Sequence, residues 1–201
     1  TFAENFDSFS FVYAHPLHAV QLSKVKGYLP IAKYAETFDE AVVISQKSIT
    51  GSDVKQIQGK NVACVYGTPS HAALLIDMHN NHAEVEFEPI LKDSYPKVLM
   101  AVSIGEADFG VILKSVWDDM LTMKERVRVH YATSSHSLVH VFMLKPTLES
   151  HLVKLREILT SMHSDKEGIE IMKRLKCPSI SPFDTNDLKK LQQQLLVCHY
   201  D

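Results

Sequence analysis

The chain has 201 residues, of which 45% are hydrophobic and 22% are charged. This composition excludes a disordered chain, and the length fits one large α/β domain or two small lobes. A net charge of −3 argues against a nucleic-acid-binding surface, which is normally basic. No apolar run approaches the ~20 residues needed to cross a bilayer.

The first two thirds of the sequence alternate between patterns typical of strands and of helices. We predict strands over residues 9–14, 40–48, 61–66, 83–90, 107–114, 127–133 and 138–145. We predict helices that begin at Pro16 and that cover 70–80, 94–106 and 115–126, with a helical turn over 52–59 capped by Ser52. Strands separated by helices favour parallel pairing, so residues from about 50 to 130 should form a compact βαβα unit.

From Pro146 onward the pattern becomes helical. Apolar residues recur at intervals of three and four, which predicts two amphipathic helices and then a third, capped near Thr185 or Asn186. The three cysteines give no disulfide framework. Cys64 lies in an apolar strand and should be a buried thiol, while Cys177 and Cys198 flank the last helix and their pairing stays open.

The stretch "VACVYGTPSHAALLIDM" (62–78) reads as a buried strand that leads directly into a helix. Helix N-termini carry unpaired N–H groups and a partial positive charge, and Thr68 and Ser70 would add hydroxyl donors there. An anion could therefore bind at this turn. Thr68 or Ser70 acting as an ordinary helix cap explains the same pattern and is the simpler interpretation of this stretch alone. The stretch matches neither the dinucleotide fingerprint nor the P-loop.

The order of segments along the chain resembles the periplasmic solute-binding proteins of type 2, in their phosphate, phosphite and phosphonate branch. The segments that carry the resemblance are "FSFVYAHPLHAVQL", "YLPIAKYAETFDEAVVISQKS", "DVKQIQGKNVACVYGTPSHAALL", "VLMAVSIGEADFGVILKS" and "RVRVHYATSSHSLVHVFMLKP". The resemblance implies an α/β fold with two lobes joined by two crossing strands. Residues 1–42 and 138–201 would form the first lobe, incomplete at its N-terminus, and residues 43–137 the second.

The resemblance also implies a ligand site between the lobes. Its residues in this sequence would be Tyr13, Thr68, Ser70, His71, Ser94, Tyr95 and His136. Three places differ from the family pattern. Pro69 removes one donor from the turn, and Tyr95 stands where a ligand-facing histidine is usual. The return crossing reads Ser134-Ser135-His136, where a proline and often an acidic residue are usual. The expected ligand is therefore a small anionic or zwitterionic solute, phosphonate-like or otherwise polar.

The implied role is capture of this solute by hinge closure, without chemistry and without a cofactor, for an ABC permease or a membrane sensor. The expected location is periplasmic, or extracytoplasmic with a membrane tether. No nucleic-acid partner is expected, and the open sheet edge of an incomplete first lobe would favour a homodimer.

Two other classes of function stay open at this stage. The effector domain of a LysR-type regulator shares the two-lobe architecture and a hydroxyl-bearing turn at a helix N-terminus. A small hydrolase or transferase is the weaker alternative, because "HYATSSHS" places Ser and His side by side but the sequence contains no GxSxG nucleophile elbow.

Eleven histidines raise the question of a metal site. His15 and His18 are three residues apart, and His136 and His140 are four apart. No cysteine or carboxylate cluster completes either pair, and residues four apart on a strand lie too far apart for one tetrahedral ion. We therefore expect solvated or hydrogen-bonded histidines and no metal.

Overall fold

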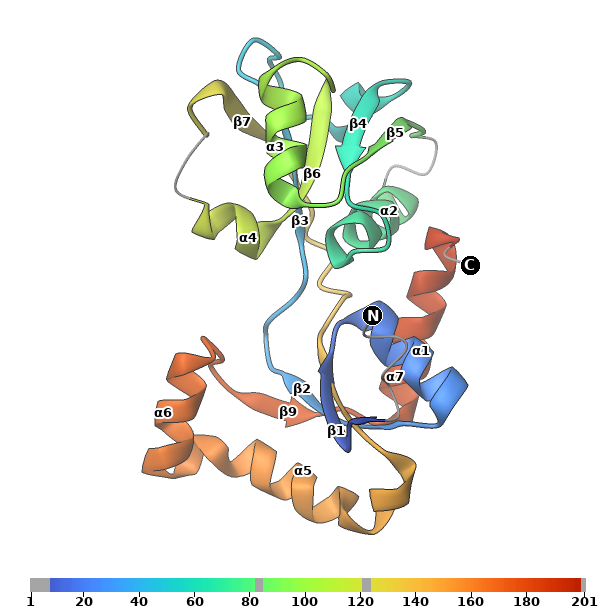
Figure 1. Cartoon of the computed structure of the whole chain (residues 1–201), viewed down its shortest axis with the longest axis vertical. Helices are drawn as coiled ribbons and strands as arrows, with labels where there is room; N and C mark the ends of the chain where they lie inside the picture. The colour runs from blue at the N-terminus through green and yellow to red at the C-terminus, as the bar shows by residue number, and fades with distance from the viewer. Residues whose placement is uncertain (1–7, 82–84, 121–123, 200–201) are drawn as a thin grey trace. The chain divides into compact units, whose positions relative to one another are not determined.

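The computed structural model describes residues 8–81, 85–120 and 124–199, which fall into two compact units (Figure 1). Unit 1 contains the chain up to Phe38 and again Val139–Gln194, and unit 2 contains Asp39–Leu138 and the chain from Leu195 onward. The C-terminal segment thus groups with unit 2, whereas the sequence interpretation placed it in the first lobe. The reason is that the 3₁₀ turn η6 (Leu196–Cys198) packs against helix α2 (Pro69–Asn81).

Unit 1 is built on a four-stranded antiparallel sheet with the order β1-β8-β2-β9. Its strands are β1 (Phe11–Ala14), β2 (Leu29–Tyr34), β8 (Val141–Leu144) and β9 (Ile180–Pro182). Its helices are α1 (Pro16–Lys26), α5 (Leu152–Ser161), α6 (Lys166–Arg174) and α7 (Thr185–Leu195), with the 3₁₀ segments η4 (Pro146–His151) and η5 (Met162–Ser164). Strand β1 therefore forms one edge of the sheet, and β9 forms the other.

The local sequence explains the first two elements of unit 1. In β1, Val12 and Ala14 are buried while Phe11 and Tyr13 are exposed, the alternation of a strand with one covered face. Helix α1 begins at Pro16, whose fixed φ suits the first helical turn. It ends at Gly27, which adopts the left-handed conformation (φ 69°) that closes many helices.

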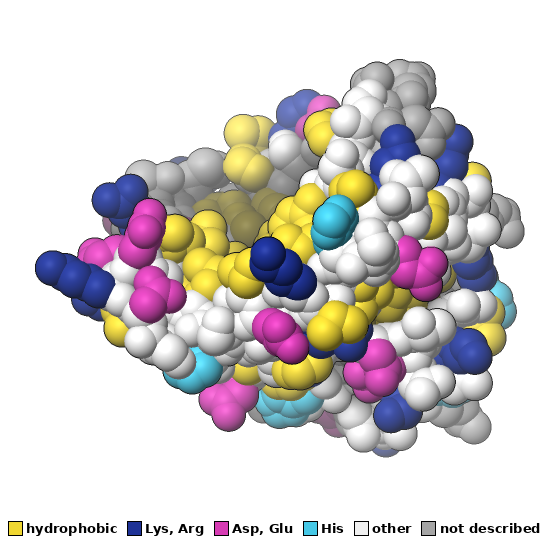
Figure 2. Space-filling model, turned by 90° about the horizontal axis from the view of Figure 1, so that it is seen from below, with side chains coloured by type: hydrophobic (Ala, Val, Ile, Leu, Met, Phe, Trp, Pro, Cys, Tyr) yellow, Lys and Arg dark blue, Asp and Glu magenta, His cyan; other side chains and the backbone are white. Residues whose placement is uncertain are grey.

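Helix α5 covers only part of the sheet of unit 1. It packs against β2 and β9 through one row of leucines. The row consists of Leu152, Leu155 and Leu159, and Leu148 of η4 extends it. Its partners are Ile31, Ala32, Phe142, Leu144, Cys177 and Ile180. No residue of α5 is fully buried, and Val153 and Ile158 point to solvent. Figure 2, which views the molecule from this side, shows such hydrophobic side chains lying between charged ones.

Unit 2 is built on a five-stranded sheet with the order β5-β4-β6-β3-β7. Its strands are β3 (Ala41–Gln46), β4 (Asn61–Cys64), β5 (Glu88–Leu91), β6 (Phe109–Leu113) and β7 (Val127–Ala132). Its helices are α2, α3 (Tyr95–Ser103) and α4 (Lys114–Asp119), with the 3₁₀ segments η2 (Val54–Ile57) and η3 (Lys124–Arg126) and the turn η6. The prediction of parallel pairing is confirmed for β4 with β5 and β6, but it is wrong for β3, which runs antiparallel to β6 and β7.

The core of unit 2 lies between the sheet and helix α3. Val98, Leu99 and Val102 of α3 pack on strand residues that include Ile44 and Ile112. Gly110 of β6 allows the close approach, because a Cβ there would lie 2.8 Å from side-chain carbons of both Val98 and Val102. Helix α2 packs against β3 and β6 and buries most of its length. The sheet of unit 2 therefore packs against both α2 and α3.

Two strands of unit 1 were not predicted. Strand β2 begins with Leu29-Pro30, and proline is unusual inside a strand. Its pairing with β8 also contains a register shift, so its sequence lacks the regular alternation that would predict a strand. Strand β9 has only three residues and depends on pairing with β2. The predicted strand 83–90 lies partly outside the described residues, and the structure shows a strand there over 88–91. The predicted helix 115–126 also lies partly outside the described residues.

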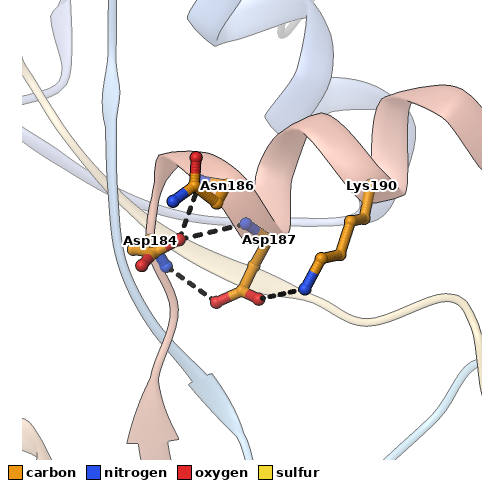
Figure 3. Close-up of polar contacts among 4 residues, drawn as sticks. All are labelled: Asp184, Asn186, Asp187 and Lys190. Atoms are coloured by element: carbon orange, nitrogen blue, oxygen red, sulfur yellow. Dashed lines mark hydrogen bonds and ion pairs between the residues drawn. The ribbon is translucent and has the colours of Figure 1, made fainter.

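The helix caps also differ from those predicted. Asp53, not Ser52, caps the turn η2 by accepting a hydrogen bond from Lys55 N. Helix α7 begins at Thr185, and the cap is Asp184, whose Oδ1 accepts from Asn186 N at 2.7 Å and Asp187 N at 3.0 Å (Figure 3). Asp187 Oδ2 accepts in return from Asp184 N at 3.2 Å. This reciprocal arrangement is a capping box with aspartate at both positions, and its backbone hydrogen bonds hold the pKa of Asp184 below the usual value.

All three cysteines are buried and free. The prediction for Cys64 is confirmed, and burial raises its pKa to about 11. Cys177 belongs to unit 1 and Cys198 to unit 2. The Cys198 Sγ donates to Ala72 O of α2 at 3.8 Å, and burial raises its pKa to about 12, so this thiol holds the C-terminal segment as a neutral, unreactive group.

Candidate functional site: the N-terminus of helix α2

The turn between β4 and α2 leads into a helix whose first residues, Pro69 and Ser70, are buried. Gly67 adopts the left-handed conformation (φ 69°), and Pro69 is the first residue of the helix. The first hydrogen bond of helical type runs from Ala72 N to Thr68 O at 3.0 Å. The N–H groups of Ser70 and His71 precede this bond, so they lie at the end of the helix where the dipole favours an anion.

Three hydroxyl groups form a chain at this helix end. Thr68 Oγ1 donates to Val65 O at 2.7 Å and lies 3.1 Å from Ser70 Oγ. Ser70 Oγ in turn lies 3.1 Å from the Tyr95 hydroxyl, which comes from the first residue of α3. The structure thus brings together Thr68, Ser70 and Tyr95, although 25 residues separate the last two.

Burial divides the roles of these hydroxyl groups. Ser70 is 0% exposed, whereas Thr68 and Tyr95 are partly exposed. Solvent therefore reaches part of the Thr68 and Tyr95 side chains but not the Ser70 side chain. Ser70 is placed to orient both of them, and it also joins the start of α2 to the start of α3.

Ser94 lies next to this chain as the N-cap of α3. Its backbone is extended (φ −160°), and its side chain makes no capping hydrogen bond to the helix. Hydrogen bonds from Lys97 and Ser94 hold the pKa of Asp93 below its usual value. The Ser94 hydroxyl therefore donates a hydrogen bond to the Asp93 carboxylate instead of capping α3.

His71 follows Ser70 in α2 and lines a cavity of unit 2. Its side chain lines this cavity together with Tyr66, and the two ring centres are 5.5 Å apart. The residue is only 6% exposed, and burial lowers its pKa to about 4. The imidazole is therefore neutral at pH 7, and its contribution to an anion site is its backbone N–H, without a positive charge.

His136 lies in a turn that Glu40 organises. Glu40 Oε1 accepts from His136 N at 2.7 Å, and Glu40 Oε2 accepts from Ser135 N at 3.3 Å and from the Thr133 hydroxyl. His136 itself is exposed and has a positive φ of 50°. Sequence reasoning did not single out Glu40, because an acidic residue before a strand carries no signal of a partner 96 residues later.

Tyr13 belongs to unit 1, whereas the other six predicted site residues belong to unit 2. Its ring stacks on Tyr34 at 4.7 Å and on His140 at 5.1 Å, and it lies 4.7 Å from Phe142. The residue is 40% exposed. It is thus the solvent-facing member of an aromatic group on the sheet of unit 1.

Three histidines gather beside this aromatic group. The ring centres of His15 and His18 are 3.7 Å apart, and those of His15 and His140 are 6.3 Å apart. Burial, with smaller contributions from His18 and His140, lowers the pKa of His15 to about 3. Across residues 8–81, 85–120 and 124–199, no three His, Cys, Asp or Glu side chains are grouped so that they could hold a metal ion.

None of the helices in the described part of the chain is long and apolar enough to cross a membrane.

Solved structures with the same fold include several binding proteins. PhnD1 from Prochlorococcus marinus in complex with methylphosphonate is 16% identical with a TM-score of 0.73, covering 95% of this chain and 79% of that one. The periplasmic aliphatic sulphonate binding protein SsuA from Escherichia coli is 14% identical with a TM-score of 0.73 (98% and 77%). XAC2383 from Xanthomonas citri bound to ATP is 17% identical with a TM-score of 0.72 (95% and 78%). These likenesses confirm the two-lobe α/β fold that the sequence predicts.

The family comparison covers most of the sequence. No curated protein matches the chain significantly. The comparisons lend no support to the LysR-type alternative or to a homodimer. The profile described as "ABC transporter, phosphonate, periplasmic substrate-binding protein" matches residues 3–188. The chain therefore belongs to this family of extracytoplasmic substrate-binding components of ABC transporters.

Proposed function

We propose that this protein binds a small phosphonate or sulfonate at the N-terminus of α2 and delivers it to an ABC permease in the periplasm. The observation that carries the proposal is the chain of hydroxyl groups from Thr68 through Ser70 to Tyr95 at a helix N-terminus. Family membership supports the transport role. The ligand class is supported by two similar structures, one in complex with methylphosphonate and one of an aliphatic sulphonate binding protein.

The proposed site holds the anion with neutral donors. Its oxygens accept hydrogen bonds from the N–H groups of Ser70 and His71, from the Tyr95 hydroxyl, and from the Thr68 hydroxyl, whose single O–H would turn from Val65 O to the ligand on binding. The helix dipole compensates the ligand charge, because the His71 imidazole is neutral at pH 7. Neutral donors of this kind suit a tetrahedral oxyanion and need no lysine or arginine.

The remaining predicted residues would contact the ligand when the units close. Tyr13 would present its exposed ring from unit 1, and Ser94 and His136 would complete the walls on unit 2. Closure follows from contacts that the ligand makes better in the closed form than in the open form. No chemical step on the ligand is part of this proposal, so bound methylphosphonate should be recovered unchanged.

Calorimetric titration with methylphosphonate, ethanesulfonate and inorganic phosphate tests the proposal. Thr68→Val keeps the shape of the side chain and removes the hydroxyl, so it should weaken binding of the preferred anion about tenfold. Tyr95→Phe should act in the same direction. Thr50→Val, at an exposed threonine of the same unit, is the matched control and should leave affinity unchanged.

Two results would contradict the proposed function. One is the absence of binding by all three anions at millimolar concentration. The other is an equal affinity of the Thr68→Val and Thr50→Val variants for an anion that does bind, because the site would then lie elsewhere.

A further inference from the structure

Unit 2 contains a cavity whose lining includes none of Thr68, Ser70 and Tyr95. It is an open cavity of about 510 Å³, a volume within the range of small-molecule sites. Three segments bound it: the loop around Gln58 and Gly59, the extended segment 85–89, and the C-terminal residues 197–199, with α2 as the floor. All of these segments belong to unit 2.

Hydrogen bonds fix the walls of this cavity. Gly59 N donates to Glu86 O at 2.8 Å, and Glu86 N donates to Gln58 Oε1 at 3.0 Å, which ties two walls together. The third wall is held on α2 by the Cys198 thiol, which donates to Ala72 O. The cavity is therefore formed before any ligand arrives, which lowers the entropy cost of binding.

The lining combines apolar and aromatic surface with negative charge. Leu75, Phe87 and Val197 supply apolar contacts, and Tyr66, which is 56% exposed, supplies a second ring. Glu86 and Glu88 supply two exposed carboxylates, and neither has an ion pair with any residue that the structure describes. Among the residues that the structure describes, no lysine or arginine lines the cavity.

We propose that this cavity binds a small organic amine with an aromatic or aliphatic body. The ammonium group would lie near the carboxylates of Glu86 and Glu88, where the faces of Tyr66 and Phe87 also attract a cation. The body would pack against Leu75. The charge preference is opposite to that proposed for the N-terminus of α2, so the two sites select different molecules.

Tyramine, its uncharged analogue 4-ethylphenol and the carboxylate 3-(4-hydroxyphenyl)propionate test this inference by calorimetry and by amide chemical-shift mapping. Tyramine should bind and shift the amides of residues 58–59, 85–89 and 197–199, whereas the carboxylate should not bind. The double variant Glu86→Gln/Glu88→Gln should bind tyramine about tenfold more weakly. Glu125→Gln, an exposed glutamate of the same unit, is the matched control and should bind tyramine as the parent does.

Phe87→Leu adds a test that does not change charge. It keeps the apolar volume and removes the ring, so it should weaken tyramine binding but not the melting temperature. The inference is overturned if tyramine does not bind at millimolar concentration, if 4-ethylphenol binds as tightly as tyramine, or if the double variant and Glu125→Gln bind tyramine equally. Methylphosphonate affinity reports separately on the N-terminus of α2, so failure of one site does not imply failure of the other.

Discussion

The buried imidazole of His71 should make unit 2 sensitive to mild acid. Its pKa is about 4 in the folded protein against 6.5 for an exposed histidine. Below pH 6.5 the His71 imidazole is therefore mostly protonated in the unfolded chain, whereas in the folded chain it becomes protonated only near pH 4. Stability is unaffected above pH 7 and decreases as the pH falls through this window.

The size of this effect follows from the two pKa values. At pH 5 the unfolded histidine is almost fully protonated while the folded one is still neutral, and linkage gives a loss of about 2 kcal/mol relative to pH 7.5. A loss of this size is a large fraction of the free energy of unfolding of a small domain.

Urea unfolding followed by the fluorescence of Trp117 measures this loss. Trp117 is the only tryptophan of the chain and packs against the core of unit 2, so its emission reports on this unit. Between pH 7.5 and pH 5, the parent protein should lose about 2 kcal/mol more than His71→Gln, which cannot titrate. His79→Gln changes an exposed histidine of the same helix and should behave as the parent does.

Equal losses in the parent and in His71→Gln would refute this reasoning. If His71→Gln does not fold, the titration of the His71 ring proton in the parent protein, followed by NMR, gives the same answer. A pKa near 6.5 in that titration would show that the imidazole is not held in its neutral form by burial.

Three further predictions concern packing and caps. Gly110→Ala should lower the free energy of unfolding of unit 2 by about 1–3 kcal/mol in urea unfolding, because the added Cβ would collide with Val102. The double variant Gly110→Ala/Val102→Ala should lose less stability than the two single variants lose together, because the second change removes the colliding side chain. Asp184→Ala should speed hydrogen exchange of the amides at the start of α7 without affecting α6, and unchanged exchange would contradict the capping role. Glu40→Ala should destabilise unit 2 by about 1–3 kcal/mol and shift the amide resonances of the 135–136 turn, whereas an unchanged turn would show that the carboxylate does not order it.

The sequence predicted well those features that depend on neighbouring residues. The buried strand before Gly67, the helix after it and the alternation in β1 follow from local periodicity, and the structure confirms them. The order of segments, through the family resemblance, predicted the two-lobe fold. The contact between Ser70 and Tyr95 could only be expected from that resemblance, because no local pattern relates the ends of two different helices.

Features that depend on distant pairing were missed or misjudged. Strand β9 exists through its pairing with β2, and β3 runs antiparallel because it enters unit 2 from the other unit, not from a preceding helix of the same sheet. The caps Asp53 and Asp184 each lie one residue away from a predicted cap, Ser52 and Thr185. Residue preferences cannot decide between such neighbours, because Ser, Thr, Asn and Asp cap helices almost equally well. The C-terminal segment lies on α2, where the buried Cys198 contacts Ala72. No pattern in the sequence predicts this contact between residues 126 positions apart.

This C-terminal attachment has a mechanical consequence. The backbone passes from one unit to the other at residues 38–39, again at 138–139, and a third time at 194–195. The third junction lies where α7 ends and η6 begins, so the C-terminal segment is a third covalent connection between the units. A protease cut at that third junction would leave the other two connections in place and would show whether the C-terminal segment stays bound to α2 without its covalent link to α7.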